Sequence, residues 1–503
     1  MPPRASGLGT AIMALIGLSS LLVGLHMRGL QGQDLEFLGA KALVARHGPE
    51  PRMQAVGFVF SPVLVYGTLI LGSPLVLQGL LGAVSVGLLA RNLRAAALPT
   101  VWRWSWFGLI IVQPAFALML LLSPTWTLST ALLIVVTSRL CALIQADYRS
   151  DAAAPLSTSA LIIFGLVLAP LMLVRYEAWL LLPLIAGVWG FLYRRESWPF
   201  KATVVAITLF MSLVCIGAWL YVNWLFAGDP WCFLTCPSSG WRLPNSEPFI
   251  RQAGFAGGWV QAVAWVASVT PLYILMAPWI LWRTPQRVLW TLILLMPLLF
   301  PAAALWQGSF TPQLSRFGMF LAVLPIFWRY YPPSMPWQRW MITCALLLGL
   351  TTNMQLLRQG QVIPEETSVW YALAGQSPPQ TLGVQQWLTR QQSTQQMATT
   401  LLKDVRPDQQ ILTDEVVSYP LVYLVNDARR FIASHQYEFS PAIQHPDLFA
   451  DFILVAGPQS SARGHDRLLQ FWPQLATGGL PGFRELLTTP EYRLLRRATS
   501  AGN

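Results

Sequence analysis

Charged residues are scarce in this 503-residue chain. Asp, Glu, Lys and Arg make up only 11% of it, whereas an average soluble domain carries about 25%. Hydrophobic residues reach 54%, and the mean hydropathy is +0.49. This composition excludes an ordinary soluble protein and indicates an integral membrane protein. The 23 Trp residues suit such a protein, because indole rings settle at membrane–water interfaces.

Cysteine and histidine are also few, with five of each. No Cys/His set has zinc-ligand spacing, so we expect no transition-metal site built by the protein, whereas a divalent cation is left open. Residues 1–356 hold 21 Lys and Arg against 9 Asp and Glu, a net charge of +12, and residues 357–503 hold 12 against 13, a net charge of −1. The basic surplus therefore belongs to the membrane part. Without a basic, aromatic-interleaved patch in the soluble part, we expect the lipid bilayer as a partner and no nucleic acid.

Long apolar runs predict about eleven transmembrane helices. The N-terminal run lacks a small-residue cleavage site, which favours an uncleaved first span over a signal peptide. The segment 56–72 is ambiguous, because it is short and contains Pro62. One alternative is a surface-lying or half-inserted helix; the other is a further span, which would move every later loop to the opposite side of the membrane. The predicted spans lie near 7–27, 74–90, 104–122, 126–145, 157–174, 178–193, 202–226, 258–282, 287–306, 316–331 and 338–356.

Basic residues in the short loops predict the orientation, because cytoplasmic loops are enriched in Lys and Arg. With the N-terminus in the cytoplasm, the cytoplasmic loops contain more Lys and Arg than the loops on the outer side of the membrane. The exception is the first outer loop, 28–55. An odd number of spans then puts the C-terminal part on the periplasmic or extracellular side. We therefore expect a multi-pass protein of the cell (inner) membrane.

The C-terminal part predicts a small α/β domain outside the membrane, at 381–503, after a Gln-, Ser- and Pro-rich linker at 357–380. The membrane domain is then 1–356. A helix is expected at 384–402. Strands are expected at 410–414, 421–425, 430–434 and 451–457.

Arg175 and Glu177 interrupt an apolar stretch that is nearly twice one membrane thickness. A charge at membrane depth costs about 2.5–3.5 kcal/mol on the more lenient scale, so such residues usually face a polar cavity or a partner. The expected geometry is two helices that meet at one face of the bilayer. The alternative is a self-paired turn that only links two spans.

Three further sets of residues on the predicted outer side could carry chemistry. Asp34 and Glu36 follow the first span closely, where a partly desolvated carboxylate can act as general base; the alternative is two solvated acids. Arg316 begins a span and can bind phosphate with its fork of donors, or can serve as an interfacial anchor. Cys232 and Cys236 can form a disulfide in an oxidising compartment, or remain free thiols.

Four stretches occur in an order that resembles the GT-C superfamily of membrane glycosyltransferases, in the branch of the dolichyl-phosphate-mannose–protein mannosyltransferases and lipid A aminoarabinose transferases. They cover about 30–330 and read QDLEFLGAKALVARHG, RYEAWLLLP, NWLFAGDPWCFL and SRFGMFLAVLP. The chain departs from the family's pattern at Phe37-Leu38 and at Ser61-Pro62, which leaves the sugar and the acceptor open.

The resemblance implies a glycosyltransferase that uses a polyprenyl-phosphate-linked sugar on the outer side of the membrane. Asp34 matches the family's first-loop catalytic acid and would be the general base. Arg175, Glu177 and Arg316, with Glu36, would line the donor site. Two other classes stay open: a transporter or flippase of lipid-linked glycans, and a catalytically inactive partner with the same fold.

Overall fold

The computed structural model describes residues 6–48, 62–149, 157–235, 259–284, 286–306, 312–434 and 436–498. At some helix ends (6–7, 147–149, 235, 259–263 and 304–306) it describes the backbone alone. The chain divides into two compact units. The first comprises 1–24, 77–222 and 246–379, and the second comprises 25–76, 223–245 and 380–503.

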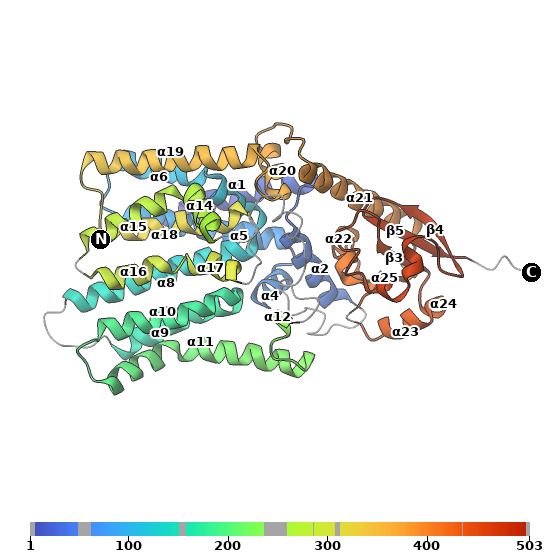
Figure 1. Cartoon of the computed structure of the whole chain (residues 1–503), viewed down its shortest axis with the longest axis horizontal. Helices are drawn as coiled ribbons and strands as arrows, with labels where there is room; N and C mark the ends of the chain where they lie inside the picture. Colours follow the sequence, from blue (N-terminus) through green and yellow to red (C-terminus); the bar gives the residue numbers. More distant parts are fainter. Residues whose placement is uncertain are drawn as a thin grey trace, which may run out of the picture. The chain divides into compact units, whose positions relative to one another are not determined.

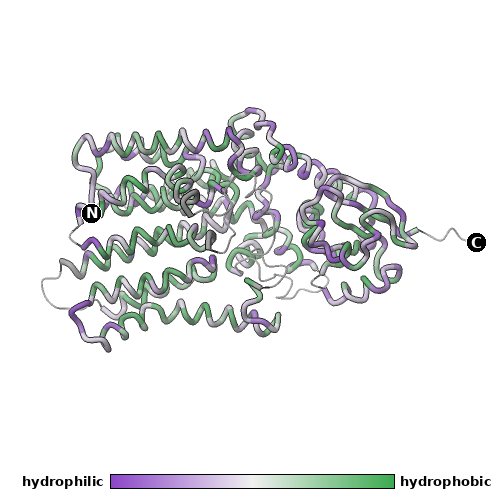
Figure 2. The backbone as a smooth tube through the Cα atoms, in the orientation of Figure 1, coloured by the Kyte–Doolittle hydropathy of each residue, from purple (hydrophilic) through white to green (hydrophobic). Residues whose placement is uncertain are grey.

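The first unit is a bundle of helices, which Figure 2 shows as apolar along most of their length. Apolar side chains on every face suit helices that are surrounded by lipid and by each other, since a helix satisfies all of its interior backbone groups itself. Helices α8 and α18 pack together, as do α10 with α16 and α15 with α19. The helices that lie wholly or mostly in this unit (Figure 1) are α1 (Ser6–Met27), α5 (Pro74–Ala95), α6 (Thr100–Ile111), α7 (Pro114–Leu122), α8 (Pro124–Arg149), α9 (Thr158–Val174), η1 (Tyr176–Leu180), α10 (Leu181–Leu192), α11 (Trp198–Ala227), α14 (Trp259–Val269), α15 (Pro271–Arg283), α16 (Arg287–Leu295), α17 (Leu299–Trp306), η2 (Leu314–Phe317), α18 (Gly318–Tyr330), α19 (Pro336–Arg358) and α20 (Pro364–Leu373).

Five helices of the described residues are long and apolar enough to cross a membrane, namely α1, α5, α8, α11 and α19. The pair α6 and α7 also qualifies as one span that bends by 59°. Pro114 lies at this bend, where proline has no N–H to continue the helical hydrogen bonds. These six correspond to six of the eleven predicted spans. The other five predicted runs fold as shorter or broken helices, so the total of eleven stays a prediction.

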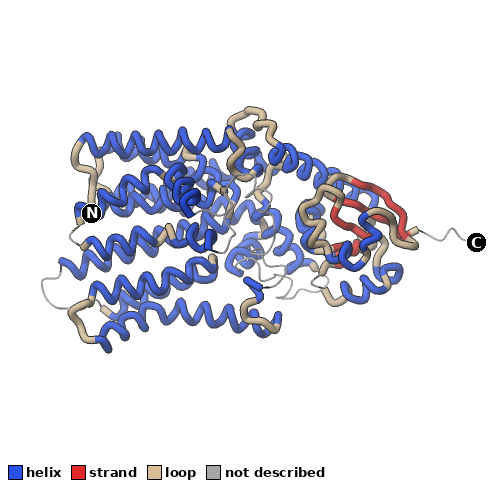
Figure 3. Tube along the Cα trace, viewed as in Figure 1, coloured by secondary structure: helices blue, strands red, loops and turns tan. Residues whose placement is uncertain are grey.

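The second unit contains a five-stranded sheet with the strand order β2-β1-β3-β5-β4, drawn red in Figure 3. Strand β1 pairs in parallel with β2 and β3, whereas β5 pairs antiparallel with β3 and β4. The elements of this unit are α2 (Gln33–His47), α4 (Pro62–Leu71), α12 (Cys232–Thr235), α21 (Leu382–Asp404), β1 (Ile411–Thr413), α22 (Glu415–Val425), η3 (Ala428–Arg430), β2 (Phe431–Ile432), α23 (Phe439–Gln444), α24 (Pro446–Phe449), β3 (Phe452–Ala456), α25 (Arg467–Phe471), η4 (Pro473–Ala476), β4 (Phe483–Thr488) and β5 (Tyr492–Arg497).

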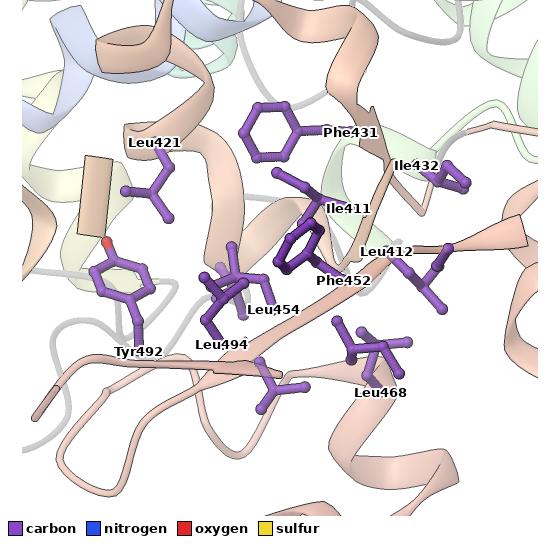
Figure 4. Close-up of a cluster of buried hydrophobic side chains, with 14 of the residues drawn as sticks. Ile411, Leu412, Leu421, Phe431, Ile432, Phe452, Leu454, Leu468, Tyr492 and Leu494 are labelled. Atoms are coloured by element: carbon purple, nitrogen blue, oxygen red, sulfur yellow. The ribbon is translucent and has the colours of Figure 1, made fainter. Parts of the chain in front are cut away.

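The core of the sheet domain is formed by side chains from both sides of the sheet (Figure 4). Ile411, Phe452 and Leu494 of the strands lie in it, with Leu421 of α22. Helix α2, which follows the first span, contributes Ala40 and Val44 to the same core. The helix that carries Asp34 and Glu36 is therefore part of this domain's hydrophobic structure, although more than 300 residues separate it from the sheet in the sequence.

Several local predictions for this unit are confirmed. The helix expected at 384–402 is α21, and the strands expected at 410–414, 430–434 and 451–457 are β1, β2 and β3. The prediction of a strand at 421–425 is wrong, because these residues lie in α22. Asp414 caps this helix by accepting a hydrogen bond from Val416 N, which favours a helical start directly after β1.

The structure describes helices in two segments near the predicted domain boundaries. Helix α20 lies within the predicted linker 357–380. The described part of the ambiguous segment 56–72 is the ten-residue helix α4. At about 1.5 Å per residue, ten residues reach about half of a 30 Å hydrocarbon core. The domain limits and the orientation in the membrane stay predictions.

Candidate active site

Arg175 lies at a break between two apolar helices. Helix α9 ends at Val174, Arg175 is extended (φ −143°, ψ 129°), and the short 3₁₀ helix η1 leads into α10. Pro183 helps to place this break, since a continuous helix would need an N–H at position 183 to bond the carbonyl of Trp179. Two helices therefore meet at Arg175 and Glu177, as predicted, and the position of their junction at one face of the bilayer stays a prediction.

Arg175 and Glu177 form a bidentate ion pair. The Arg175 Nε donates to Glu177 Oε2 at 3.0 Å, and its Nη2 donates to Oε1. The Glu177 side chain is buried, and the Arg175 side chain is 19% exposed. The ion pair expected for a self-paired turn is therefore present. The other neighbours of Arg175 show whether the pair has a further role.

The indole of Trp126, in the first turn of α8, brings a second arginine beside this pair. The Arg175 guanidinium carbon lies 3.9 Å from the centroid of the Trp126 ring, and that of Arg316 lies 5.3 Å from it. Because both distances end at one ring, the two guanidinium carbons lie within about 9 Å of each other. Trp126 is buried, so cation–π attraction holds both groups in a partly desolvated place. The structure thus unites three predicted residues, Arg175, Glu177 and Arg316.

Glu366 of α20 fixes the backbone on which Arg316 is mounted. Its Oε2 accepts a hydrogen bond from Leu314 N at 2.6 Å, and its Oε1 accepts one from Ser315 N at 2.8 Å. Both donors belong to the start of η2, where backbone N–H groups have no partner within the helix. Burial raises the pKa of Glu366 to about 7, against the lowering effect of these hydrogen bonds and of the Arg316 charge.

The charges of this cluster add up to a small positive value. Arg175 and Glu177 cancel, and Arg316 adds one positive charge beside them. Guanidinium groups that share an aromatic ring and keep a net positive charge suit a phosphate group. Trp126 and Glu366 were not predicted from the sequence. Trp126 is the first residue of the predicted span 126–145, and Glu366 follows the last predicted span, and neither position marks a site residue.

Asp34 and Glu36 lie in the first turn of α2, in the second unit. Asp34 is half-buried and Glu36 is buried. Burial raises the pKa of Glu36 to about 7, against the opposing influence of the Arg390 charge and of a hydrogen bond from Gln391. This placement favours a structural contribution of Glu36 between α2 and α21. Its predicted contact with a donor stays a prediction, as does the role of Asp34.

Lys41 anchors α2 further along. Its buried side chain forms an ion pair with the partly exposed Glu415 at the start of α22. Phe37 of α2 also packs edge-on against Tyr419 of α22, with ring centroids 5.5 Å apart. The helix with the predicted general base is therefore held in place by both charge and aromatic contacts.

The remaining predicted site residues concern the cysteines and metals. Cys232 is disulfide-bonded, but its predicted partner Cys236 lies outside the described residues, so the pairing stays a prediction. Within the described part of the chain, no three His, Cys, Asp or Glu side chains are grouped to hold a metal ion.

Comparison with known proteins identifies the fold. No family model matches the chain, and no curated protein matches its sequence. Among solved structures, ArnT from Cupriavidus metallidurans bound to undecaprenyl phosphate aligns over 99% of this chain and 100% of its own, with 13% identity and a TM-score of 0.53. The chain has the GT-C fold. The same protein in its apo state aligns over 97% and 99%, with a TM-score of 0.52. The oligosaccharyltransferase AglB from Archaeoglobus fulgidus aligns over 98% of this chain and 75% of its own, with 11% identity and a TM-score of 0.39.

The chain is accordingly a polytopic α-helical membrane protein with a small C-terminal sheet domain. At 13% identity the likeness concerns the fold alone, so the activity has to be argued from the residues of this chain.

Proposed function

We propose that this protein is an integral-membrane glycosyltransferase that transfers a sugar from a polyprenyl-phosphate-linked donor to an acceptor on the outer side of the membrane. The observation that carries the proposal is the pair of guanidinium groups on Trp126, in a chain with the fold of ArnT. The ArnT structure contains undecaprenyl phosphate. A lipid-phosphate ligand of the same class suits two arginines beside a buried ring.

The phosphate is the leaving group of the proposed reaction. As the bond between the anomeric carbon and the phosphate oxygen breaks, negative charge develops on that oxygen. Arg316 and Arg175 would stabilise this charge, and their fixed positions on Trp126 reduce the reorganisation needed during the reaction. Glu366 would act as a positioning residue, because it holds η2 and thus Arg316.

Asp34 is the proposed general base. An acceptor hydroxyl or amine would attack the anomeric carbon, and its proton would pass to the Asp34 carboxylate as the new glycosidic bond forms. The polyprenyl phosphate leaves with the bonding electrons. The anchoring of α2 by Lys41 and Glu415 would keep this carboxylate in a fixed place. General-base catalysis contributes about 10²–10⁴-fold to the rate of such reactions.

The decisive experiment replaces Asp34 by Asn in the purified full chain and measures transfer from a polyprenyl-phosphate sugar. We expect Asp34→Asn to lower kcat by about 100-fold or more, while binding of polyprenyl phosphate is retained. The matched control is Asp404→Asn, because Asp404 is exposed at the end of α21. Full transfer by Asp34→Asn would exclude it as the base. Absence of donor binding by the wild-type chain would contradict the proposed function itself.

A second pair of variants tests the phosphate site. Arg316→Lys keeps the charge but loses the planar fork, so we expect weaker binding of polyprenyl phosphate. Arg329→Lys, in the last turn of α18, is the control for the same chemical change elsewhere. Equal binding by the two variants would argue against Arg316 as a phosphate ligand.

A further inference from the structure

The second unit contains a pocket that the proposed reaction does not use. It has a volume of about 400 Å³ and opens to the surface. Pockets for small molecules have volumes of about 300–1,000 Å³, so this one can hold a headgroup-sized ligand. Residues from the end of α1, from α2, α4 and the segment after it, and from α22 line it: His26, Gly39, Ala42, Leu43, Arg46, Thr68, Leu69, Gly72, Ser73, Pro74, Leu75, Tyr423, Leu424 and Asn426.

The pocket lies on a different side of α2 from Asp34. Its α2 residues are Gly39, Ala42, Leu43 and Arg46, which recur at helical spacing and form one face. At about 100° per residue, Asp34 points about 130° away from the centre of that face. A ligand in this pocket is therefore a different molecule, or a different part of one, from the group that the Asp34 carboxylate would reach.

The lining combines basic and polar groups with apolar ones and includes no acidic side chain among the described residues. Arg46 is exposed at the rim. The Nδ1 atom of His26 is buried and has no hydrogen-bond partner among the residues that the structure describes. A buried polar atom without a partner calls for one from outside the chain. The ring of Tyr423 lies edge-on to that imidazole, with centroids 6.2 Å apart.

Gly39 allows this arrangement. A Cβ atom built at Gly39 would lie 2.3 Å from the Tyr423 ring, so any other residue would push that ring away. The close approach of α22 to α2 thus depends on glycine at this position, and it holds the Tyr423 ring on the wall of the pocket.

The sequence places the pocket at a membrane boundary. His26 is in the last turn of α1, whose apolar stretch Leu8–Met27 is long enough to cross a bilayer. Helix α4, on another wall, exposes apolar side chains, with Ile70 84% and Leu71 37% exposed. Such side chains are stable against acyl chains and unfavourable in water. Leu69 and Leu75 continue this apolar surface into the pocket.

We propose that this pocket binds the phosphate-bearing headgroup of an anionic membrane lipid. Arg46 and His26 meet the phosphate, Tyr423 and Asn426 supply further polar groups, and the leucines contact the first part of the acyl chains. A guanidinium group binds phosphate oxygens through charge-assisted hydrogen bonds. The inference does not depend on the proposed transferase activity, because its ligand and its readout are separate from sugar transfer.

Lipid binding to the purified full chain, measured by native mass spectrometry, tests the proposal. Phosphatidylglycerol and phosphatidylcholine with the same acyl chains are titrated separately, and inorganic phosphate is added as a competitor. We expect tighter binding of phosphatidylglycerol by the wild-type chain, and about tenfold weaker binding by Arg46→Gln and by His26→Gln, as for the loss of one charge-assisted contact. Arg358→Gln is the matched control, because this exposed arginine also lies in the last turn of a helix.

Three outcomes would overturn the proposal. Equal binding of the two lipids would remove the requirement for a negative headgroup. Equal loss of phosphatidylglycerol binding in Arg46→Gln and Arg358→Gln would assign the effect to overall charge. Full displacement by millimolar inorganic phosphate, independent of acyl-chain length, would assign the pocket to free anions. Arg46 is exposed, so its replacement leaves the fold intact and the test valid.

Discussion

Replacing Glu36 by Gln is expected to change how the stability of the protein depends on pH. Glu36 is buried in the first turn of α2, near Arg390 and Gln391. Its burial raises the pKa from the ordinary value of 4.5 to about 7. Glutamine has nearly the same shape and stays uncharged at every pH, so this substitution removes the titration and keeps the packing.

The sign follows from proton binding in the two states. Between pH 4.5 and pH 7 the folded chain keeps the Glu36 proton, whereas the unfolded chain has released it. Stability from this group is therefore fully present below pH 4.5 and is lost as the pH rises through about 7. A shift of 2.5 pKa units at 1.36 kcal/mol per unit corresponds to about 3 kcal/mol. Wild type should lose about this much more free energy of unfolding than Glu36→Gln between pH 4 and pH 8.

Thermal unfolding of both chains in the same detergent, at pH 4 and at pH 8, measures this difference. For about 500 residues that unfold together, about 3 kcal/mol corresponds to a Tm difference of about 3 °C. Other titrating groups, Glu366 among them, contribute equally to both chains and cancel in the comparison. Glu196→Gln removes an exposed carboxylate and is the control. If wild type and Glu36→Gln change in Tm by the same amount, the buried environment assigned to Glu36 is refuted.

Three further substitutions test the contacts of the two units. Glu366→Gln weakens the hydrogen bonds to the start of η2, each worth about 1.5–3 kcal/mol with a charged acceptor. Both the Tm and the affinity for polyprenyl phosphate should therefore fall. An unchanged affinity would show that Glu366 does not position Arg316. Lys41→Met leaves the partly exposed Glu415 without its partner and should cost about 1.5–3 kcal/mol of stability, as for a charged hydrogen bond. The double variant Lys41→Met/Glu415→Leu should largely restore this loss, and no recovery in thermal unfolding would contradict the ion pair as the cause. Trp126→Leu removes cation–π contacts worth about 0.5–2 kcal/mol each and should weaken polyprenyl-phosphate binding in a titration; intact binding would show that the ring does not organise the arginines.

The sequence predicted elements whose pattern is local. Helix α21 has helical spacing of apolar residues, and β1 and β3 are short apolar runs that the sheet buries on both faces. The run at 421–425 has the same composition and yet lies in α22, because periodicity cannot separate a buried strand from a buried helix over five residues. Strands β4 and β5 were not predicted from the sequence. Their exposed positions are charged, as at Arg484 and Glu485, so neither contains a continuous apolar run.

The sequence could predict only those site residues whose charge is energetically unfavourable in an apolar run. Arg175, Glu177 and Arg316 are charged in or beside apolar runs, which marks them in any sequence. Trp126 is one of 23 tryptophans, and nothing in its neighbourhood distinguishes it. Glu366 lies 50 residues after Arg316 and acts on it through backbone N–H groups, a relation that exists only in the folded chain. Likewise, the core shared by α2 and the sheet depends on contacts across most of the sequence.

The self-pairing of Arg175 with Glu177 sharpens the proposed role of the cluster rather than removing it. Two unopposed guanidinium groups beside a buried indole would repel each other and would favour a doubly charged ligand. With Glu177 present, the charge of Arg175 is cancelled, and Arg316 contributes one further positive charge beside the same ring. On the proposed function, the donor is a sugar phosphodiester with one negative charge, which this cluster balances. The product is a phosphate monoester that approaches two negative charges at neutral pH, and its second charge is the one that Arg175 and Arg316 would stabilise as it develops on the leaving oxygen. The same ion pair that resembles a purely structural turn therefore matches the charge of the cluster to that of the donor.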